Sequence, residues 1–573
     1  MRPHILQNGD GDCVNLQLLL PLGFLPQPFS CPSPATLMTQ PTTVSDAIPI
    51  DVTSNIEIAV FSADNEAAIH LLEIIQCKSS PPTLKSDENS IGYQLSIPLS
   101  CDSPDARRFR WRIGAGASPA LVEKGLCCCE PDILLCPPGR TPSSAAVRRF
   151  IKDIHATIHF HPESGVLLLK THSSRPLIYE QGDVDNDDLI LDMLGKVNTC
   201  VLRRQRNFLR FGQYRFALEF LVKDDDLSRV KAQLDENLGC RFNGSRPSQL
   251  LNFIPMQHPE TSWNVWLHQK IPNTSITSGV NIHTGQPVAV KKLQITARSR
   301  QHTLHRLQLA CQYKSRPDKG VLGIIDAWCE HKTSPPCLFS EAEASHRCRR
   351  LFYSMPLAEH HFLNMPWKKI DTNTRLLYFH QTLVGLAELH RQDVTHGNIL
   401  PESLLLLPGT KPTPMTDRSL PRKAVISLSM QRLDKPNPSV CVAPEVWRNQ
   451  KTVDGPKVDV WALAASWLFA FVRPPSGIKI TKASYQTLQK TLDTQIEKGF
   501  MKESFAALLR QMLAWEPHDR PSTTELLADT TWESVLVHAQ SIEDNKKRKR
   551  MEKMQRTPSQ GRRVRLLSPD VND

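Results

Sequence analysis

The spacing of apolar residues changes along the chain, and this change constrains the fold more than any other feature of the sequence. Tyr214, Phe216, Leu218 and Phe220 occupy every second position, so all four lie on one face of a predicted strand. Similar short β-like runs precede them, at 57–61, 93–97, 133–135, 156–160 and 166–169. Several short strands separated by turn residues predict an all-β sandwich over residues 51–222.

The C-terminal part of the chain has a helical spacing instead. Between residues 374 and 390, apolar side chains recur at steps of three and four, which predicts an amphipathic helix. Residues 461–471 are apolar nearly throughout and predict a buried helix. Because β-like segments precede these helices, residues 263–536 are expected to form an α+β domain. The full length of 573 residues has room for more than one such unit.

Three further segments are expected to lack a packed core. Residues 1–50 are rich in Pro, Ser and Gln and are predicted to be a disordered leader, residues 223–262 a linker, and residues 537–573 a basic disordered tail. Of the net charge of +11, residues 546–565 supply +9, from ten basic residues and the single acid Glu552. The rest of the chain is nearly balanced, so no specific nucleic-acid surface is predicted.

The cysteines indicate a reducing compartment. The 15 cysteines include the run 127–129, which is unlike the evenly spaced disulfide framework of a small secreted domain. Neither this run nor Cys136 has the spacing of metal ligands, so no metal site is predicted. The sequence contains no apolar stretch of about 18 residues, the length that a membrane span needs. An intracellular protein without a membrane partner is therefore expected.

Five short motifs occur in order between residues 287 and 522. They are V-A-V-K ending at Lys291, T-H-G-N around His396, A-P-E ending at Glu445, D-V-W opening on Asp459, and E-P-H-D-R-P-S containing Arg520. Their order and spacing resemble the protein kinase family. The resemblance implies a bilobal fold over residues 263–536, in which Lys291 would contact ATP phosphates. It also implies that His396, Asp459 and a buried Glu445–Arg520 pair support the fold.

The residues of phosphoryl transfer depart from the kinase pattern. The four departures are Asn398 for the catalytic aspartate, Leu400 for the lysine two positions later, Ser403 for the metal-binding asparagine and Ser427 for the metal-binding aspartate. An amide cannot accept the substrate proton, and Mg²⁺ prefers anionic oxygen. The glycine-rich loop keeps one glycine, and no glutamate lies between residues 293 and 328 to pair with Lys291.

These departures favour a catalytically impaired kinase-fold adaptor, a pseudokinase, that needs no cofactor although ATP binding is open. The alternative is a divergent serine/threonine kinase that binds ATP through Lys291 and phosphorylates protein substrates. The sequence alone leaves the enzymatic activity undecided between the two.

The centre of the β-rich half carries a second resemblance. Residues 153–167, together with 111–114, 132–135 and 211–212, resemble a forkhead-associated (FHA) domain, a β-sandwich that binds phosphothreonine peptides. The resemblance makes Lys152, His155 and Arg175 the candidates for phosphopeptide binding. Only His155 matches the family pattern, and the histidine of such sandwiches mainly braces a loop, which favours a structural role for it. The implied partners are other proteins, phosphorylated or not. A phosphopeptide-binding scaffold is thus a further alternative, and a plain protein-contact sandwich is another.

The basic tail resembles a nuclear import signal. Its main cluster consists of Lys546, Lys547, Arg548, Lys549 and Arg550, and such runs are typical of nuclear localisation. The nuclear import machinery is then an expected partner and the nucleus the expected location, with the cytoplasm as the alternative if the tail is merely a solvated segment.

Overall fold

The computed structural model describes residues 56–537 with gaps, of which the longest are 98–109, 119–129, 237–248, 332–347 and 408–422, and beyond them residues 540, 541, 544 and 548. The predicted leader and the cysteine run 127–129 lie outside the described residues. So does the predicted import signal apart from Arg548, which is helical.

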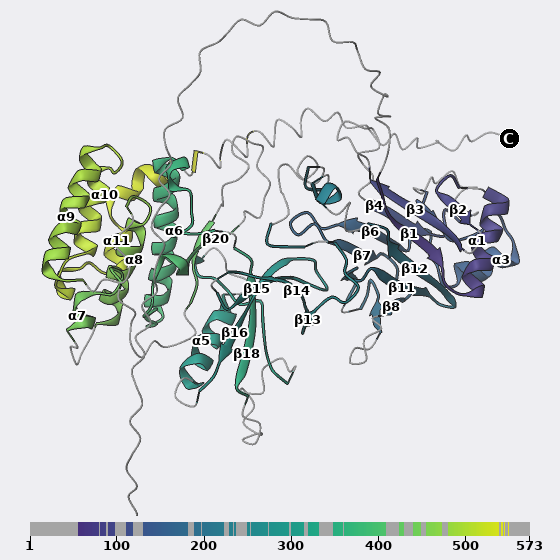
Figure 1. The fold of residues 1–573 in the computed structure, drawn as a ribbon, viewed down its shortest axis with the longest axis horizontal. Helices are drawn as coiled ribbons and strands as arrows, with labels where there is room; N and C mark the ends of the chain where they lie inside the picture. Colours follow the sequence, from purple (N-terminus) through teal and green to yellow (C-terminus); the bar gives the residue numbers. More distant parts are fainter. Residues whose placement is uncertain are drawn as a thin grey trace, which may run out of the picture. The chain divides into compact units, whose positions relative to one another are not determined.

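Two β-sheets form the N-terminal half (Figure 1). The first has the order β2 (Leu84–Asp87), β3 (Ser90–Ile97), β1 (Ile56–Ala63), β12 (Tyr214–Phe220), β11 (Arg206–Phe211), β8 (Leu177–Glu180) and β9 (Leu189–Leu191). The second has the order β10 (Thr199–Val201), β7 (Leu167–Thr171), β6 (Ala156–Phe160), β4 (Arg110–Gly114) and β5 (Ile133–Leu134). The strands pair antiparallel except β4 with β5. Residues from both sheets belong to one hydrophobic core, so the predicted β-rich half is confirmed.

The period-two pattern reports the buried face of β12 correctly. Tyr214, Phe216, Leu218 and Phe220 are all buried, whereas Glu219 between them is exposed. The centre of the second sheet is built in the same way, since Ile158 and Phe160 of β6 point into the core and His159 lies between them. Because side chains alternate between the two faces of a strand, burial of one face fixes the register of each strand. The register in turn fixes where the following loop begins.

Two helices in the β-rich half were not predicted. Helix α1 (Glu66–Ser79) begins where the Asn65 side chain accepts a hydrogen bond from the backbone N–H of Ala68, and it buries Leu71, Leu72 and Ile75 against the first sheet. Helix α3 (Pro142–Arg148) begins at a capping box in which Thr141 and Ser144 bond each other's backbone. Both starts use the side-chain capping typical of helix N-termini.

A six-stranded antiparallel sheet opens the C-terminal half. Its order is β13 (Thr261–Ser262), β14 (Val265–Lys270), β15 (Ile276–Asn281), β16 (Pro287–Gln294), β18 (Arg350–Pro356) and β17 (Asp326–Cys329). Helix α5 (Arg300–Gln312) follows β16, and a small sheet joins β19 (His360–His361), β20 (Leu404–Leu407) and β21 (Lys423–Ile426). The predicted linker 223–262 contains β13 and the helical residues 228–232 and 234–236.

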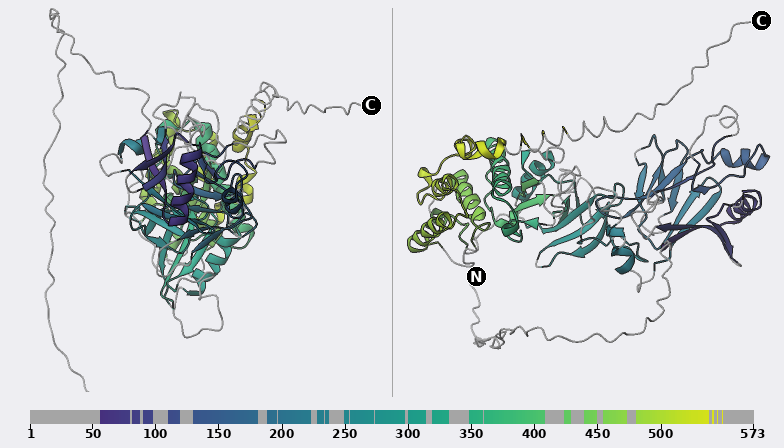
Figure 2. Two further views of the ribbon diagram at one scale, coloured as in Figure 1. Left: turned by 90° about the vertical axis from the view of Figure 1, so that its right-hand side faces the viewer. Right: turned by 90° about the horizontal axis from the view of Figure 1, so that it is seen from above.

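The remaining described helices gather into one bundle, coloured green to yellow in Figure 2. They are α6 (Thr372–Arg391), α7 (Pro444–Trp447), α8 (Gly455–Leu468), α9 (Lys482–Glu497), α10 (Glu503–Met512) and α11 (Thr523–Leu527), with the 3-10 turns η4 (Trp367–Lys369), η5 (Pro401–Ser403), η6 (Pro517–Asp519) and η7 (Thr530–Trp532). They enclose a second core. None of the described helices is both long and apolar enough to cross a bilayer.

Both predicted helices of this half are present, and both differ from the prediction at their ends. Helix α6 is two residues longer at its start and one at its end than the predicted 374–390. Helix α8 starts at the Asp454 cap and ends at Leu468, three residues before the predicted end. Every residue from Asp459 to Leu468 is buried, so an apolar run without a polar stripe does correspond to a core helix.

Candidate functional site

A carboxylate from helix α8 fixes the loop that corresponds to the kinase catalytic loop. The fully buried Asp459 accepts hydrogen bonds from the backbone N–H of His396 at 2.6 Å and of Gly397 at 2.8 Å. Its Oδ2 also lies 3.1 Å from Nε2 of His390 at the end of α6. Hydrogen bonds to ionised groups are about twice as strong as neutral ones. The structure thus holds this loop through the predicted residue Asp459.

His396 connects the same loop to the segment after β21. Its Nε2 lies 2.9 Å from the carbonyl oxygen of Ser427, and its Nδ1 accepts from the backbone N–H of Asn398 at 3.3 Å. The pattern assigns the proton to Nε2. Burial lowers the pKa of His396, and the neutral ring is the form that both bonds require. His396 therefore connects the loop to the segment after β21.

The four replaced positions come together around this connector. Ser403 Oγ donates to the carbonyl oxygen of Asn398 at 3.3 Å and accepts from the backbone N–H of Leu400 at 3.3 Å, while the N–H of Ser427 donates to the carbonyl oxygen of Ser403 at 2.8 Å. Within the described part of the chain, no hydrogen bond or ion pair joins these four residues to a carboxylate. The loop and the segment after β21 have an amide at Asn398 and a hydroxyl at Ser427, where the kinase pattern has carboxylates.

Lys291 lies on β16 without the partner it has in active kinases. Burial lowers the pKa of its ammonium group, and across the described ranges no acid forms an ion pair with it. Helix α5, which would supply the pairing glutamate, contains no acidic residue. The helix carries a buried cation, Arg306, which donates a hydrogen bond to the backbone carbonyl of Thr395, just before His396. The sequence-based prediction missed Arg306, because its partner is 89 positions away.

The single glycine of the expected phosphate loop has a packing role. Gly279 lies inside β15, and a Cβ there would come 2.5 Å from the carbonyl oxygen of Trp266 on β14. Close approach of two strands thus requires glycine at this position. Gly279 therefore does not supply the flexible backbone turn that would surround phosphate groups.

The predicted Glu445–Arg520 pair is present and fully buried. Nη1 and Nη2 of Arg520 lie 2.7 and 2.8 Å from the two carboxylate oxygens of Glu445, and both side chains have 0% exposure. The other Arg520 donors reach the carbonyl oxygens of Ala514, Lys457 and Trp515. Every donor of the guanidinium is therefore used, in the bidentate geometry that stabilises arginine–carboxylate pairs.

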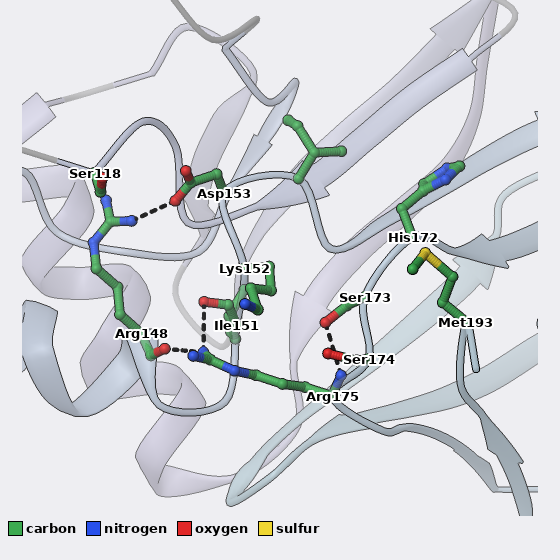
Figure 3. Close-up of a pocket in the computed structure, with 11 residues that line it drawn as sticks. Ser118, Arg148, Ile151, Lys152, Asp153, His172, Ser173, Ser174, Arg175 and Met193 are labelled. Carbon is green, nitrogen blue, oxygen red and sulfur yellow. Dashed lines mark hydrogen bonds and ion pairs between the residues drawn. The ribbon is translucent and has the colours of Figure 1, made fainter. Parts of the chain in front are cut away.

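A second candidate site is a surface pocket of about 510 Å³ in the β-rich half (Figure 3). Two of its lining residues, Lys152 and Arg175, are predicted phosphopeptide contacts. Nη1 of Arg175 donates to the carbonyl oxygens of Arg148 and Ile151, which holds the guanidinium across the pocket floor. Lys152 is exposed, and no hydrogen bond or ion pair from the described residues engages its ammonium group. The pocket therefore has two cations in its lining, of which Lys152 is exposed and Arg175 is half-buried.

His155, the third predicted phosphopeptide residue, is not among the residues that line this pocket. It is fully buried, its Nδ1 accepts from the backbone N–H of Lys152 at 3.2 Å, and its ring meets Phe211 edge-on. Burial, assisted by the charge of Arg175, lowers the pKa of His155 to about 4. His155 is therefore neutral near pH 7, and it positions the loop around Lys152 through its hydrogen bond to the Lys152 backbone.

Arg148 is a pocket residue that the sequence did not reveal. Its guanidinium lies 2.8 Å from Asp153 and donates to the carbonyl oxygens of Ala115, Gly116 and Ala117. Residues 115–117 follow the end of β4, and the arginine reaches them from α3. No local pattern could have indicated Arg148, since these partners are 31 to 33 positions earlier.

Comparison with known proteins supports the kinase part of these predictions. Residues 273–532 match the protein kinase domain family, so this part of the chain is a kinase-fold domain. A segment of 154 residues is 30% identical to serine/threonine-protein kinase STE20 of Saccharomyces cerevisiae, covering 26% of this chain and 16% of that protein. A segment of 163 residues is 29% identical to mitogen-activated protein kinase kinase kinase mkh1 of Cytospora mali, covering 26% of this chain and 8% of that protein. The chain thus spans less than a fifth of these relatives.

Proposed function

We propose that this protein is a kinase-fold adaptor that does not transfer phosphate and whose β-rich half binds other proteins in intracellular signalling. The observation that carries the proposal is the loop around His396. Asn398, Ser403 and Ser427 occupy the positions of the base and the metal ligands, and their described bonds go to the backbone and to His396. Active kinases use carboxylates at the positions of Asn398 and Ser427 and an amide oxygen at the position of Ser403, and these groups hold Mg²⁺ and orient the substrate hydroxyl.

The way the loop is held also favours an adaptor. Asp459, His396 and Arg306 keep the loop in place through contacts within the protein. The loop can therefore keep its shape without nucleotide or metal, and no cofactor is needed for folding. Lys291 leaves ATP binding open, since a desolvated ammonium group gains from a phosphate partner. The basic tail supports a nuclear location through the import machinery, with the cytoplasm as the alternative.

Two measurements on the purified full chain test the proposal. We expect no incorporation of labelled phosphate from Mg²⁺–ATP into the chain or a generic protein substrate, and no Mg²⁺-dependent rise of the melting temperature with ATP. The control is Lys291→Met, which removes the one remaining phosphate contact of the family pattern. Phosphate incorporation that disappears in Lys291→Met would show a divergent kinase and refute the proposal.

The pocket with Lys152 and Arg175 favours a second function, the binding of a phosphorylated peptide. The charge of Arg148 is offset by its partner Asp153, whereas Lys152 and Arg175 add two cations for an anion. Both described bonds of the Arg175 guanidinium use Nη1, so Nη2 remains a donor for phosphate. Bonds between these donors and a phosphate are charge-assisted and hence favourable.

Fluorescence anisotropy with phosphothreonine peptides and their unphosphorylated counterparts tests this second function on the full chain. We expect phosphate-dependent binding that weakens at least tenfold in Lys152→Ala and in Arg175→Ala. Lys78→Ala, at an exposed position at the end of α1, should bind like the parent protein. Equal binding of both peptide forms would instead indicate a plain protein-contact surface.

A further inference from the structure

Three side chains of the metal-binding type meet where β17 and β18 leave their sheet. Cys329 is the last residue of β17, His331 follows two positions later, and Cys348 lies two positions before β18 begins. The strands pair antiparallel, with Cys329 opposite Leu351. This pairing brings Cys348 beside a thiol that lies 19 positions earlier. None of the three residues belongs to either candidate site described above.

The distances among the three ligand atoms fit a tetrahedral zinc ion. Nδ1 of His331 lies 3.1 Å from Sγ of Cys348 and 4.0 Å from Sγ of Cys329, and all three atoms lie within 4.8 Å of one another. Tetrahedral zinc with bonds of about 2.3 Å to sulfur and about 2.1 Å to nitrogen separates nitrogen from sulfur by about 3.6 Å. The two observed separations fall on either side of that value. One ring nitrogen therefore faces both sulfurs.

The surroundings suit a structural metal site. Cys329 and Cys348 are buried, with 0% and 5% exposure, while His331 is exposed at the surface. Beside them, Glu330 accepts from the backbone N–H of Arg349 and from the Arg350 side chain. These hydrogen bonds join the residue after β17 to the start of β18. Thiolates are the form that binds metal.

We propose that Cys329, His331 and Cys348 bind a structural zinc ion that closes the connection between β17 and β18. Two sulfurs and an imidazole nitrogen select zinc over the hard cations Mg²⁺ and Ca²⁺. Binding displaces one proton from each thiol and involves no electron transfer. The fourth ligand is left unassigned. The sequence-based prediction of no metal site is thereby revised, because strand pairing creates a cluster that local spacing does not show.

The competing chemistry at this place is a disulfide. Cys348 is disulfide-bonded in the structure, and its partner lies outside the described residues. A sulfur atom in a disulfide cannot bind zinc as a thiolate, so the two states exclude each other. The proposal concerns the dithiol form that a reducing compartment maintains, and the experiment must separate the two forms.

The experiment measures zinc and cysteine oxidation in the same full-length protein. Cells are quenched in acid and alkylated before lysis to record the oxidation state of Cys348, and a parallel sample is purified under reductant for elemental analysis. We expect one zinc per chain, Cys348 as a thiol, and a cobalt-substituted form with the visible absorption of tetrahedral thiolate coordination. His331→Ala and Cys348→Ser should lose at least nine-tenths of the zinc. Cys77→Ser and His305→Ala, at exposed positions elsewhere, should retain it.

Three results would overturn the inference. The first is a well-folded parent protein without zinc, and the second is zinc that survives Cys348→Ser. The third is recovery of Cys348 from cells as a disulfide. Because His331 is exposed, His331→Ala should fold even if a cysteine variant does not, so the test remains decisive. Metal content is independent of phosphate transfer, and the proposed adaptor function stands or falls separately.

Discussion

Replacing Glu445 by glutamine probes the central support of the kinase-fold domain. The substitution keeps the shape of the side chain but removes the negative charge that faces Arg520. The guanidinium then remains in a site with 0% exposure, 4.9 Å from the ring of Trp461. It keeps its carbonyl partners, but no anion among the described residues replaces Glu445 there. We therefore expect Glu445→Gln to lower the stability of this domain strongly.

The magnitude follows from the burial of the pair. Removing one partner of a buried ion pair costs about 3–5 kcal/mol. For a domain of this size, 1 kcal/mol corresponds to about 2–4 °C in melting temperature, so a fall of about 6–20 °C is expected. The Arg448–Glu516 pair is the matched control, because its side chains are 38% and 40% exposed and 3.3 Å apart. Glu516→Gln should cost at most about 1 kcal/mol.

Urea titrations followed by tryptophan fluorescence measure this effect on the full chain. Of the 10 tryptophans, only Trp111 lies before residue 263, so the signal reports mainly on the kinase-fold domain. Trp461 beneath Arg520 reports on the site itself. A loss below about 1 kcal/mol in Glu445→Gln, equal to that of Glu516→Gln, would refute the argument from burial.

Two further predictions concern stability. Burial lowers the pKa of His155, His159 and His161 from 6.5 to about 4, so below pH about 6.5 the unfolded chain binds more protons than the folded one and stability falls as the pH drops toward about 4. Urea midpoints followed by circular dichroism at pH about 7 and about 5 should show the loss, and a pH-independent midpoint would contradict it. In α6, a Cβ at Gly385 would overlap the carbonyl oxygen of Gly320. Gly385→Ala should therefore destabilise by about 1–3 kcal/mol although alanine favours helices by about 1 kcal/mol; a raised urea midpoint would contradict the overlap.

The parts of the fold that were predictable are those encoded by local periodicity. The alternation through Tyr214 and Phe220 and the helical spacing of α6 each report a buried face within one element. Helices α1 and α3 were missed because they are embedded among strands, although the caps at Asn65 and Thr141 were visible signals. Capping residues mark where a helix begins but do not by themselves outweigh a surrounding β pattern.

The candidate sites divide in a similar way. Motif order along the chain identified Asp459 and the Glu445–Arg520 pair, because these residues keep their types in the kinase pattern. By contrast, the contacts of Arg306 with Thr395 and of Arg148 with residues 115–117 join distant segments. Tertiary packing creates such contacts. Neither the periodicity of apolar residues nor the spacing of motifs along the sequence indicates them. The cluster of Cys329 and Cys348 has the same origin, in the pairing of β17 with β18.

The Arg306–Thr395 contact bears on how this domain could be regulated. In active kinases the lysine of the third strand forms an ion pair with a glutamate of the following helix. Movement of that helix breaks or restores the ion pair and so turns the activity off or on. Here α5 has no acidic residue to engage Lys291, and its arginine is attached to main chain of the neighbouring loop. Helix α5 is thus bonded to a backbone oxygen and has no carboxylate that could form an ion pair with Lys291. Movement of α5 would therefore break the hydrogen bond between Arg306 and Thr395 instead of an ion pair with Lys291.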